Sequence, residues 1–483
     1  MHIRILTCLL LLTAYGFTAT AQDKWDLTRA VEYALENNIS VKQTDIQARL
    51  AALTHHQSRL NRLPTASLSG NFGVNSGRAI DPTTNLFTTD QLLFSGMNFN
   101  SGMTVFNFFS LKHSIEGNRL ELEAANKNIE KIKNDVALNV ATAYLLILVA
   151  IEQEKVADLS VKLTLQNMEN TRSRVEAGAL PELNLAELEA QLARDSTALI
   201  TAGATVRTNI LQLKAILNLD AATPFDVETP PLDMIPVLPI GELQPEGIYN
   251  EALVNLPQQE VNNLRIEAAR AFVKAARGQM YPSLSLFAGM GTQYSNNKIY
   301  QPGQPIFTGN YEQTQAKVNI NNQDYFIQTP VFSNPIPTGY RIAVGTQLRQ
   351  NFRQNIGLSL NIPLFNNGVA RTQWQRSKLN VSSLELTKEQ DLQTLKQNIY
   401  TSYNDAVAAI QKFNAGKKGV ETAEKAYNFA QKRYELGLLS TIDLLTNQNN
   451  LNRARVELSQ AQVDYVFRLK LLEFYKGQGL RLR

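Results

Sequence analysis

Few side chains in this 483-residue sequence combine a reactive type with the spacing that catalysis or metal binding requires. Beyond the first 22 residues there are three histidines, His55, His56 and His113. The adjacent pair points to different faces of a helix and lacks the spacing of metal ligands, so we interpret it as solvent-facing or packing. No Gly-x-Ser-x-Gly, P-loop or dinucleotide-binding motif occurs. We therefore expect no catalytic residue, no metal, no cofactor and no enzymatic activity.

One carboxylate has an informative setting. Asp443 closes the run Ser440-Thr441-Ile442-Asp443, which has the form of a capping box with aspartate in place of glutamate and predicts the start of a helix. This run follows Gly437, where a helical pattern of charged and apolar residues stops. A similar stretch surrounds Gly178, 259 residues earlier. Both glycines are expected at the position after a helix end, in the left-handed conformation.

The N-terminus predicts export from the cytoplasm. Residues 1–21 have a short basic start, an apolar run and the small-residue site Ala19-Thr20-Ala21, which is typical of a secretory signal peptide. The one cysteine, Cys8, lies inside the apolar run without a small residue before it, which disfavours a lipid anchor. The mature chain then contains no cysteine, so disulfides and thiolate metal sites are excluded.

Composition excludes other classes of protein. The net charge of +4 comes from 47 basic and 43 acidic residues, with no Lys/Arg run, so a nucleic-acid partner is not expected. The longest apolar run after residue 21 covers 143–151, which is too short to cross a bilayer as a helix, since about 20 residues are needed. Any membrane insertion must therefore use strands.

The two glycine turns belong to a longer duplication. Heptad-spaced apolar residues after each turn align at the same offset, which indicates left-handed coiled coils. We expect a first repeat over 22–219, a proline-rich linker over 220–246, a second repeat over 247–476 and a tail over 477–483. The aligned pairs are Leu185 with Leu444, Leu192 with Leu451, Leu199 with Leu458, Val206 with Tyr465, Ile210 with Leu469, and Leu213 with Leu472.

Each repeat is predicted to run helix, strand, loop, strand, very long helix, glycine turn and returning helix. The second repeat has an insertion within 295–355, a Gln/Asn/Pro/Gly-rich stretch that we interpret as a long loop. The expected helices are 27–62, 110–176 and 182–218 in the first repeat, and 247–280, 366–436 and 441–475 in the second. The expected tip turns are 177–182 and 436–441.

Four segments alternate between apolar and polar residues with a period of two. They cover 65–76, 96–107, 283–294 and 354–365, and each is about as long as a tilted membrane strand. Their polar faces carry Ser, Asn, Thr and Gly with almost no charge. Four strands cannot close a barrel, and open edges are not tolerated in lipid. Copies of the chain must therefore combine, two giving eight strands with a filled interior and three giving twelve with a lumen.

At this point the chain resembles the TolC-like outer-membrane efflux proteins over essentially all of its mature length. The resemblance rests on the duplicated order of elements, the strand end Pro363-Leu364-Phe365, and the two R-x-x-x-G-x-L turns at 174–180 and 433–439. It implies a mainly α fold with a small membrane β-barrel, in which three copies close a 12-stranded barrel above a helical tunnel. It also implies location in the outer membrane of a Gram-negative bacterium, reaching into the periplasm.

The resemblance implies a function as the exit duct of a tripartite system. Substrates would arrive from an inner-membrane pump, of RND or ABC type, through a periplasmic adaptor protein. Small-molecule efflux and type I protein secretion both fit. The turns would then be periplasmic tips that dock the adaptor. The docking residues would be Arg174, Gly178, Leu180, Arg433, Gly437, Leu438 and Leu439.

The resemblance also implies that Asp443 forms a ring of three carboxylates at the tunnel entrance. Some family members carry a second acid where this chain has Thr446. They also close the entrance by an Asp–Arg contact at the positions of Asn184 and Leu439, which cannot form a salt bridge. Closure here is expected to use other contacts, such as hydrogen bonds of Asn184 or apolar packing of Leu439.

Two other classes were weighed against the duct. A passive porin would need many more strands per chain and no long helices. A periplasmic coiled-coil scaffold without channel activity explains the helices but leaves the four strands with uncharged polar faces unexplained. An outer-membrane trimer that needs detergent supports the duct, and a soluble elongated oligomer supports the scaffold.

Overall fold

The computed structural model describes residues 24–81, 85–89, 91–229, 238–301, 303–335 and 338–477. The expected signal peptide, most of the expected tail and part of the proline-rich segment lie outside the described residues. The chain divides into two compact units, one helical and one built around strands. The helical unit comprises Met1–His55, Glu116–Phe272 and Arg376–Arg483, and the strand unit comprises His56–Ile115 and Val273–Gln375.

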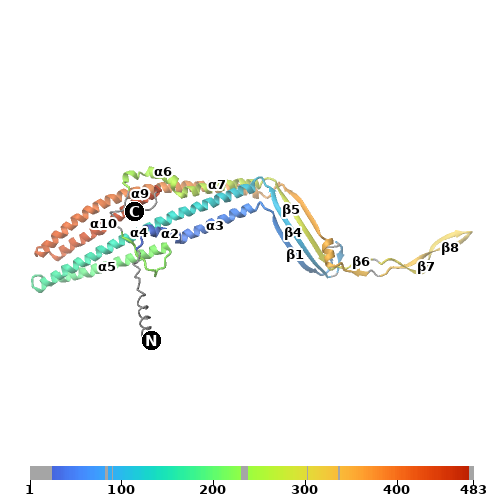
Figure 1. Cartoon of the computed structure of the whole chain (residues 1–483), viewed down its shortest axis with the longest axis horizontal. Helices are drawn as coiled ribbons and strands as arrows, with labels where there is room; N and C mark the ends of the chain where they lie inside the picture. Colours follow the sequence, from blue (N-terminus) through green and yellow to red (C-terminus); the bar gives the residue numbers. More distant parts are fainter. Residues whose placement is uncertain are drawn as a thin grey trace, which may run out of the picture. The chain divides into compact units, whose positions relative to one another are not determined.

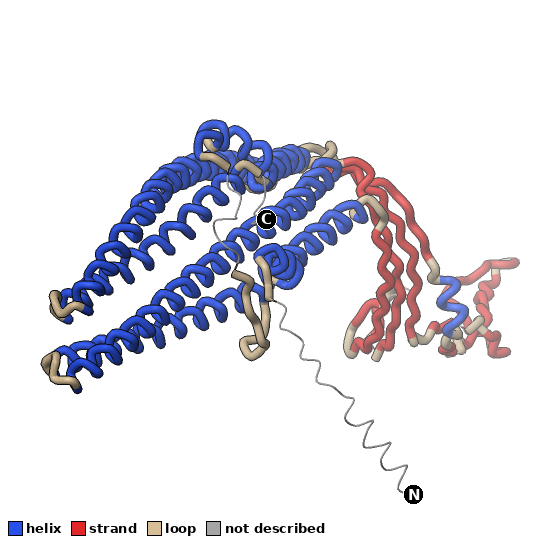
Figure 2. Tube along the Cα trace, turned by 60° about the vertical axis from the view of Figure 1, so that its left-hand side comes forward, coloured by secondary structure: helices blue, strands red, loops and turns tan. Residues whose placement is uncertain are grey.

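The helical unit is dominated by two antiparallel hairpins. Helix α4 (Ser110–Glu176) returns as α5 (Glu182–Leu217), and α9 (Val369–Glu435) returns as α10 (Thr441–Tyr475). Figures 1 and 2 show the two helices of each hairpin side by side, joined by a short turn at one end. The shorter helices are α2 (Leu27–Asn37), α3 (Ile39–Leu60), α6 (Pro245–Asn255) and α7 (Pro257–Gly278).

The continuous helices expected over 27–62 and 247–280 are wrong, because each is broken once. In the first half the break is at Asn38, whose Nδ2 donates to the Ile216 carbonyl at 2.7 Å and whose Oδ1 accepts from the Ser40 amide at 2.8 Å. Asn38 thereby ends one helix and caps the next. In the second half Leu256 is extended because it precedes Pro257, which disfavours the helical conformation of the residue before it.

The core of the helical unit forms around the middle of α4. Tyr144 and Ile147 are almost completely buried there, together with Leu213 and Leu217 of α5. Among the described residues, α4 alone is long and apolar enough to pass a length-and-composition test for a membrane span, but half of the apolar window is buried. Because the buried side chains of this window belong to the core, we interpret it as a core helix.

The strand unit contains one four-stranded antiparallel sheet in the order β1-β4-β5-β10. The registers pair Leu68 with Phe99, Phe99 with Met290, and Ala288 with Ile356. Because opposed residues share a face, the four apolar sets predicted from the sequence lie on one side of one sheet. The strands are β1 (Thr65–Asn75), β4 (Leu92–Phe106), β5 (Ser283–Ser295) and β10 (Arg353–Asn361).

The other face of this sheet is built from pairs of a larger residue and a glycine. A Cβ atom on Gly96 would lie 2.7 Å from Asn71 Oδ1, and one on Gly289 would lie 2.5 Å from Asn355 Oδ1. Gly291 stands in the same relation to Asn98, at 2.6 Å. The amides therefore lie across the glycines of the neighbouring strand, and Phe94 and Phe287 lie in the same way across Gly73 and Gly357. This face is mainly polar, with Arg353 as a charged residue opposite Gly291 at one end.

The long loop expected over 295–355 is wrong as a description of its structure. Strands β7 (Ile306–Ile320) and β8 (Gln323–Ser333) form a hairpin there. The turn uses Asn321 and Asn322 with φ of 52° and 69°, the left-handed pair that a two-residue hairpin turn requires. The remaining short elements are β2 (Ala79–Ile80), β3 (Phe87–Thr88), β6 (Ile299–Gln301), β9 (Thr338–Tyr340), α8 (Val344–Gln350) and the 3₁₀ turn η2 (Ile240–Glu242).

Candidate functional site

The two tip turns have the same hydrogen-bonded geometry. Gly178 has φ of 72°, its amide donates to the Val175 carbonyl at 2.9 Å, and the Ala179 amide donates to the Arg174 carbonyl at 2.8 Å. In the second turn Gly437 has φ of 75° and the amides of Gly437 and Leu438 donate in the same pattern. Both are Schellman motifs, so the prediction of left-handed glycines after the helix ends is confirmed.

Asp443 lies on the first turn of α10 and is exposed. Ser440 caps the helix, because its Oγ accepts from the Asp443 amide at 3.2 Å. The same hydroxyl donates to Asp443 Oδ2 at 2.7 Å. The cap is therefore confirmed, but the aspartate bonds the serine side chain where a longer glutamate would reach the serine backbone. The hydroxyl holds the carboxylate close to the turn.

The other predicted gate residues differ in their surroundings. Thr446 is exposed and its Oγ1 donates to the Ile442 carbonyl at 2.8 Å. Asn184 is half-buried on the first turn of α5. Leu439 packs against a buried cluster that includes Tyr434 and Leu444. Of the two residues expected to help close the entrance, Leu439 makes an apolar contact with this cluster. Asn184 is not part of the cluster.

The predicted docking residues lie at or beside the turns. Leu438 is strongly exposed, whereas Leu180 and Arg174 are half-buried. Arg433 and the two glycines are exposed. The exposed part of this set is therefore Arg433, Leu438, Gly178 and Gly437.

Arg174 joins the two tips within one chain. Its Nη1 donates to the Tyr434 carbonyl at 3.1 Å, and that carbonyl also accepts from the Gly437 amide at 2.9 Å. The guanidinium group thus sits at the C-terminal end of α9, where carbonyl groups concentrate negative charge. The sequence predicts Arg174 as a docking residue, and the structure gives it this second role inside the chain.

Arg174 is the last of five polar residues on one stripe of α4. Their spacing of four, three, four and three residues follows the core positions of a heptad, which are normally apolar. Four of the five are buried, and each contacts α5, α9 or α10. We call this stripe and its partners the polar seam. The α4 members are Ser160, Thr164, Asn167, Thr171 and Arg174.

The centre of the polar seam is a continuous chain of hydrogen bonds. Gln448 Nε2 donates to Thr164 Oγ1 at 2.7 Å, and Thr164 Oγ1 donates to Asp195 Oδ2 at 2.6 Å. Gln191 Nε2 donates to the other oxygen of Asp195 at 2.8 Å. Buried polar groups with complete partners cost little, whereas each unpaired one costs about 1–3 kcal/mol.

The ends of the polar seam are bonded as well. Asn452 Nδ2 donates to Ser160 Oγ at 2.8 Å on the side away from the tips. Nearer the tips, the Thr171 and Tyr434 hydroxyls lie 2.7 Å apart, and Tyr434 also lies 3.4 Å from Thr441 Oγ1. The seam therefore runs from Ser160 to the turns.

Contacts inside the second hairpin near the tips are of the opposite kind. Tyr427, Ala430 and Tyr434 of α9 pack with Leu444 and Leu451 of α10 in a buried apolar cluster. Near the tips, the helices of this hairpin are therefore held together mainly by apolar packing, while hydrogen bonds of the polar seam link the two hairpins there. Farther from the tips the hairpins also share apolar contacts, because Val463 of α10 belongs to the core around α4.

Sequence reasoning missed most of the polar seam. The heptads are visible in the sequence only through apolar positions on the returning helices, which do not include Thr164, Thr171 and Gln448. A polar residue repeated at heptad core spacing near the end of α4 was the available signal. The partners Tyr434 and Gln448 could not be found from this spacing, because they lie more than 260 positions along the chain from Thr171 and Thr164.

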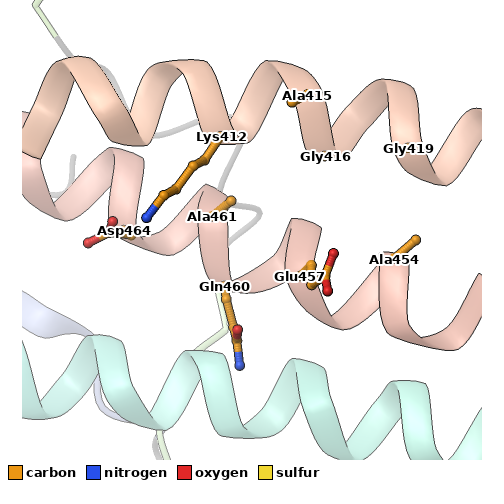
Figure 3. A pocket seen from close by; sticks show the side chains of 9 residues that line it. All are labelled: Lys412, Ala415, Gly416, Gly419, Ala454, Glu457, Gln460, Ala461 and Asp464. Carbon is orange, nitrogen blue, oxygen red and sulfur yellow. The ribbon is translucent and has the colours of Figure 1, made fainter. Parts of the chain in front are cut away.

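An open groove follows the second hairpin (Figure 3). Small residues line it, including Ala415 and Gly416 of α9 and Ala454 and Ala461 of α10. A Cβ on Gly416 would lie 3.5 Å from the Leu458 Cα, an ordinary van der Waals distance, so an alanine would also fit between the two helices here. Lys412, Glu457 and Asp464 provide charge along the groove. Over the described ranges no three of the His, Cys, Asp or Glu side chains gather as metal ligands would.

Comparison with known proteins places these features in a family. The family described as outer membrane efflux protein matches residues 30–219 and 345–477. The outer membrane efflux protein BepC of Brucella suis biovar 1 (strain 1330) is 21% identical, with 94% of this chain and 86% of BepC aligned. The outer membrane protein TolC of Escherichia coli (strain K12) is 28% identical over 128 residues, only 26% of each chain.

Solved structures share the fold. The structure of CusC has a TM-score of 0.73 at 16% identity and covers 95% of this chain and 93% of its own. That of VceC from Vibrio cholerae has a TM-score of 0.70 at 16% identity, covering 94% and 97%. The mainly helical fold with strands is thus that of outer-membrane channels. Because the family match covers more than half of its length, the chain belongs to the outer membrane efflux protein family.

Proposed function

We propose that this protein is the outer-membrane exit duct of a tripartite efflux or secretion system. The observation that carries the proposal is the four-stranded sheet, which has one continuous apolar face. No strand of the described ranges pairs with the outer edge of β1 or of β10. Phe72, Ile356 and Leu358 of the apolar face are between 63% and 76% exposed. Such a surface is unfavourable in water and favourable against lipid.

The unpaired edges support assembly of three chains. In lipid every backbone amide and carbonyl needs a partner, so β10 of one chain pairs with β1 of the next. Three chains then give twelve strands, with the mainly polar face that carries Asn71, Asn98 and Asn355 turned to the lumen. The duct performs no catalysis, and energy comes from an inner-membrane pump reached through a periplasmic adaptor at the exposed tips.

The polar seam supports a closure mechanism for the entrance. Arg174 and Tyr434 hold the two tips together, in place of the Asp–Arg contact whose positions are Asn184 and Leu439 here. Hydrogen bonds can exchange for water when the hairpins part, so opening exposes little apolar surface. Asp443 of three chains forms the carboxylate ring at the entrance and favours cations.

Fractionation combined with single-channel recording tests this proposal. Outer membranes should contain the protein, detergent should be needed to extract it, and the purified protein should form discrete conductance steps in planar lipid bilayers. Recovery in the soluble periplasmic fraction, without conductance, would instead support the coiled-coil scaffold.

A further inference from the structure

The β7–β8 hairpin is the feature that the duct function leaves unexplained. The family match omits residues 220–344, which include the whole hairpin. β5 leads away from α7 and β10 leads back to α9, so the hairpin lies at the end of the sheet opposite these helices. In the proposed duct that end faces the cell exterior.

The hairpin is a two-stranded sheet that buries neither of its faces. In the part of the chain that the structure describes, no third strand pairs with β7 or β8. An isolated hairpin of this kind is at best marginally stable in water and needs a further layer or strand. The well-formed Asn321-Asn322 turn nevertheless fixes its register.

The two faces of the hairpin differ in composition. Because opposed residues share a face and neighbours along a strand alternate, one face is aromatic and the other is largely aliphatic. The aromatic face holds a ring cluster in which Phe307 lies 5.3 Å from Tyr311 and 5.9 Å from Phe332, and Lys317 covers Phe326 at 4.7 Å. The opposite face carries Ile306, Val318, Ile320, Tyr325 and Ile327, all 42–59% exposed.

The two faces carry few charges, of which Glu312 lies opposite Thr329 on the aliphatic face. Residues 306–333 contain three charged side chains, and two of them, Lys317 and Asp324, lie 3.8 Å apart as an ion pair. An aromatic face and an aliphatic face on the same element allow a head-to-tail contact between copies, which closes into a ring when three copies share an axis. Each hairpin would then be covered on both sides.

We infer that the β7–β8 hairpins of three chains pack aromatic face against aliphatic face into a sleeve around the exit of the duct. The occupant of each apolar face is the hairpin of a second copy. Eleven residues of β8 give the sleeve a height of about 35 Å at the usual rise of a strand. The inference rests on the proposed trimeric duct and adds a contact outside the membrane.

Cysteine crosslinking on intact cells tests the sleeve, since the sequence beyond residue 8 contains no cysteine. The double variant Phe326→Cys/Thr329→Cys places one thiol on each face, and the control Phe326→Cys/Gln328→Cys places both on the aromatic face. A short bis-maleimide that does not cross membranes should shift the first variant, but not the control, from one chain to three linked chains on a denaturing gel.

Native electrophoresis of the same extracts separates the two proposals. A first variant that remains single-chain on the denaturing gel while still running as a native trimer overturns the sleeve and leaves the duct standing. Linkage to another protein also overturns it, because the occupant is then not a second copy. Absence of a native trimer in the unsubstituted protein contradicts both.

Discussion

At the scale of single residues, the tips combine a polar link with an exposed carboxylate. Arg174 bonds the carbonyl that ends α9, and Tyr434 places its hydroxyl against Thr171. Asp443 is held by its own cap, Ser440, and remains exposed. In the proposed duct, we assign closure of the entrance to Arg174 and Tyr434 and selection of the passing ions to Asp443.

Removing the Arg174 link should loosen the entrance. Arg174→Gln loses a charge-assisted hydrogen bond of about 1.5–3 kcal/mol, which shifts the tips towards separation by roughly tenfold or more. We expect higher single-channel conductance or longer open times in planar bilayers. Arg172→Gln is the matched control, because Arg172 lies on the same helix and pairs with Glu169 of that helix and Glu189 of α5. Equal behaviour of the two variants would contradict the role of Arg174.

Asp443 should control ion selectivity. Asp443→Asn keeps the size of the side chain and its bond to Ser440 but removes three charges from the trimer, so cation preference should fall while conductance persists. Reversal potentials in a salt gradient measure the effect, with Thr446→Val, one turn further along α10, as the control. Unchanged selectivity in Asp443→Asn would rule out the carboxylate ring.

Glu121 provides a residue-scale test of stability against pH. Burial on α4 raises the pKa of this carboxyl above 4.5, although Arg265 opposes the shift. When the pKa of a carboxyl is higher in the folded than in the unfolded chain, the protonated group favours folding. This contribution to stability is complete at pH values below the pKa of the unfolded chain and is lost as the pH rises through the pKa of the folded chain. Glu121→Gln should therefore raise the thermal midpoint at pH 7 and show no such gain below pH 4, measured by circular dichroism. A gain of equal size at both values would contradict the assignment.

At the scale of elements, the turns are set by glycine conformation and the helices by heptads. Any side chain at Gly437 must adopt φ of 75°, which asparagine tolerates better than other residues. Gly437→Asp also adds a negative charge to an end of a helix that already carries excess carbonyl charge. The turn is therefore sensitive to both geometry and charge.

Two substitutions at Gly437 should distinguish the effect of backbone geometry from the effect of charge, with adaptor binding as the readout. Gly437→Asp should reduce adaptor crosslinking and export of the substrate, while Gly437→Asn should keep most of both. Crosslinking in cells, with drug susceptibility as the export readout, measures the difference. If Gly437→Asp left both unchanged, docking at this turn would be wrong.

Much of the element plan could be predicted because it depends on local patterns. Alternating runs such as NIGLSLNIP predict strands, and the heptads around Leu444 and Leu451 predict helices, without any information from distant residues. The break at Asn38 could not be predicted, because its bond to the Ile216 carbonyl comes from tertiary packing. The polar seam was also missed, since polar residues at core positions carry no apolar signal until their distant partners are known.

The β7–β8 hairpin shows a different limit of prediction. Its composition of Gln, Asn, Thr, Gly and Pro favours a loop, and two bulges interrupt the alternation of β7. The Asn321-Asn322 turn between apolar runs was the signal that could have predicted it. Neither face of the hairpin packs against a core in the described structure. The alternation of apolar and polar residues along its strands is therefore weak.

At the scale of the whole molecule, the chain is incomplete alone. Among the described residues no strand pairs with the outer edges of β1 and β10, and none covers either face of the β7–β8 hairpin. The sheet also has an exposed apolar face. Three copies resolve each of these features at once, by edge pairing in the barrel and face packing outside it. Assembly is thus the central claim from which the channel, the gate and the sleeve follow.

Native mass spectrometry of protein extracted from outer membranes in detergent tests this assembly. A trimer predicts one dominant species with the mass of three mature chains, which dissociates to single chains only after unfolding. A dominant monomer or dimer that retains folded strands would contradict it, because neither closes a twelve-stranded barrel.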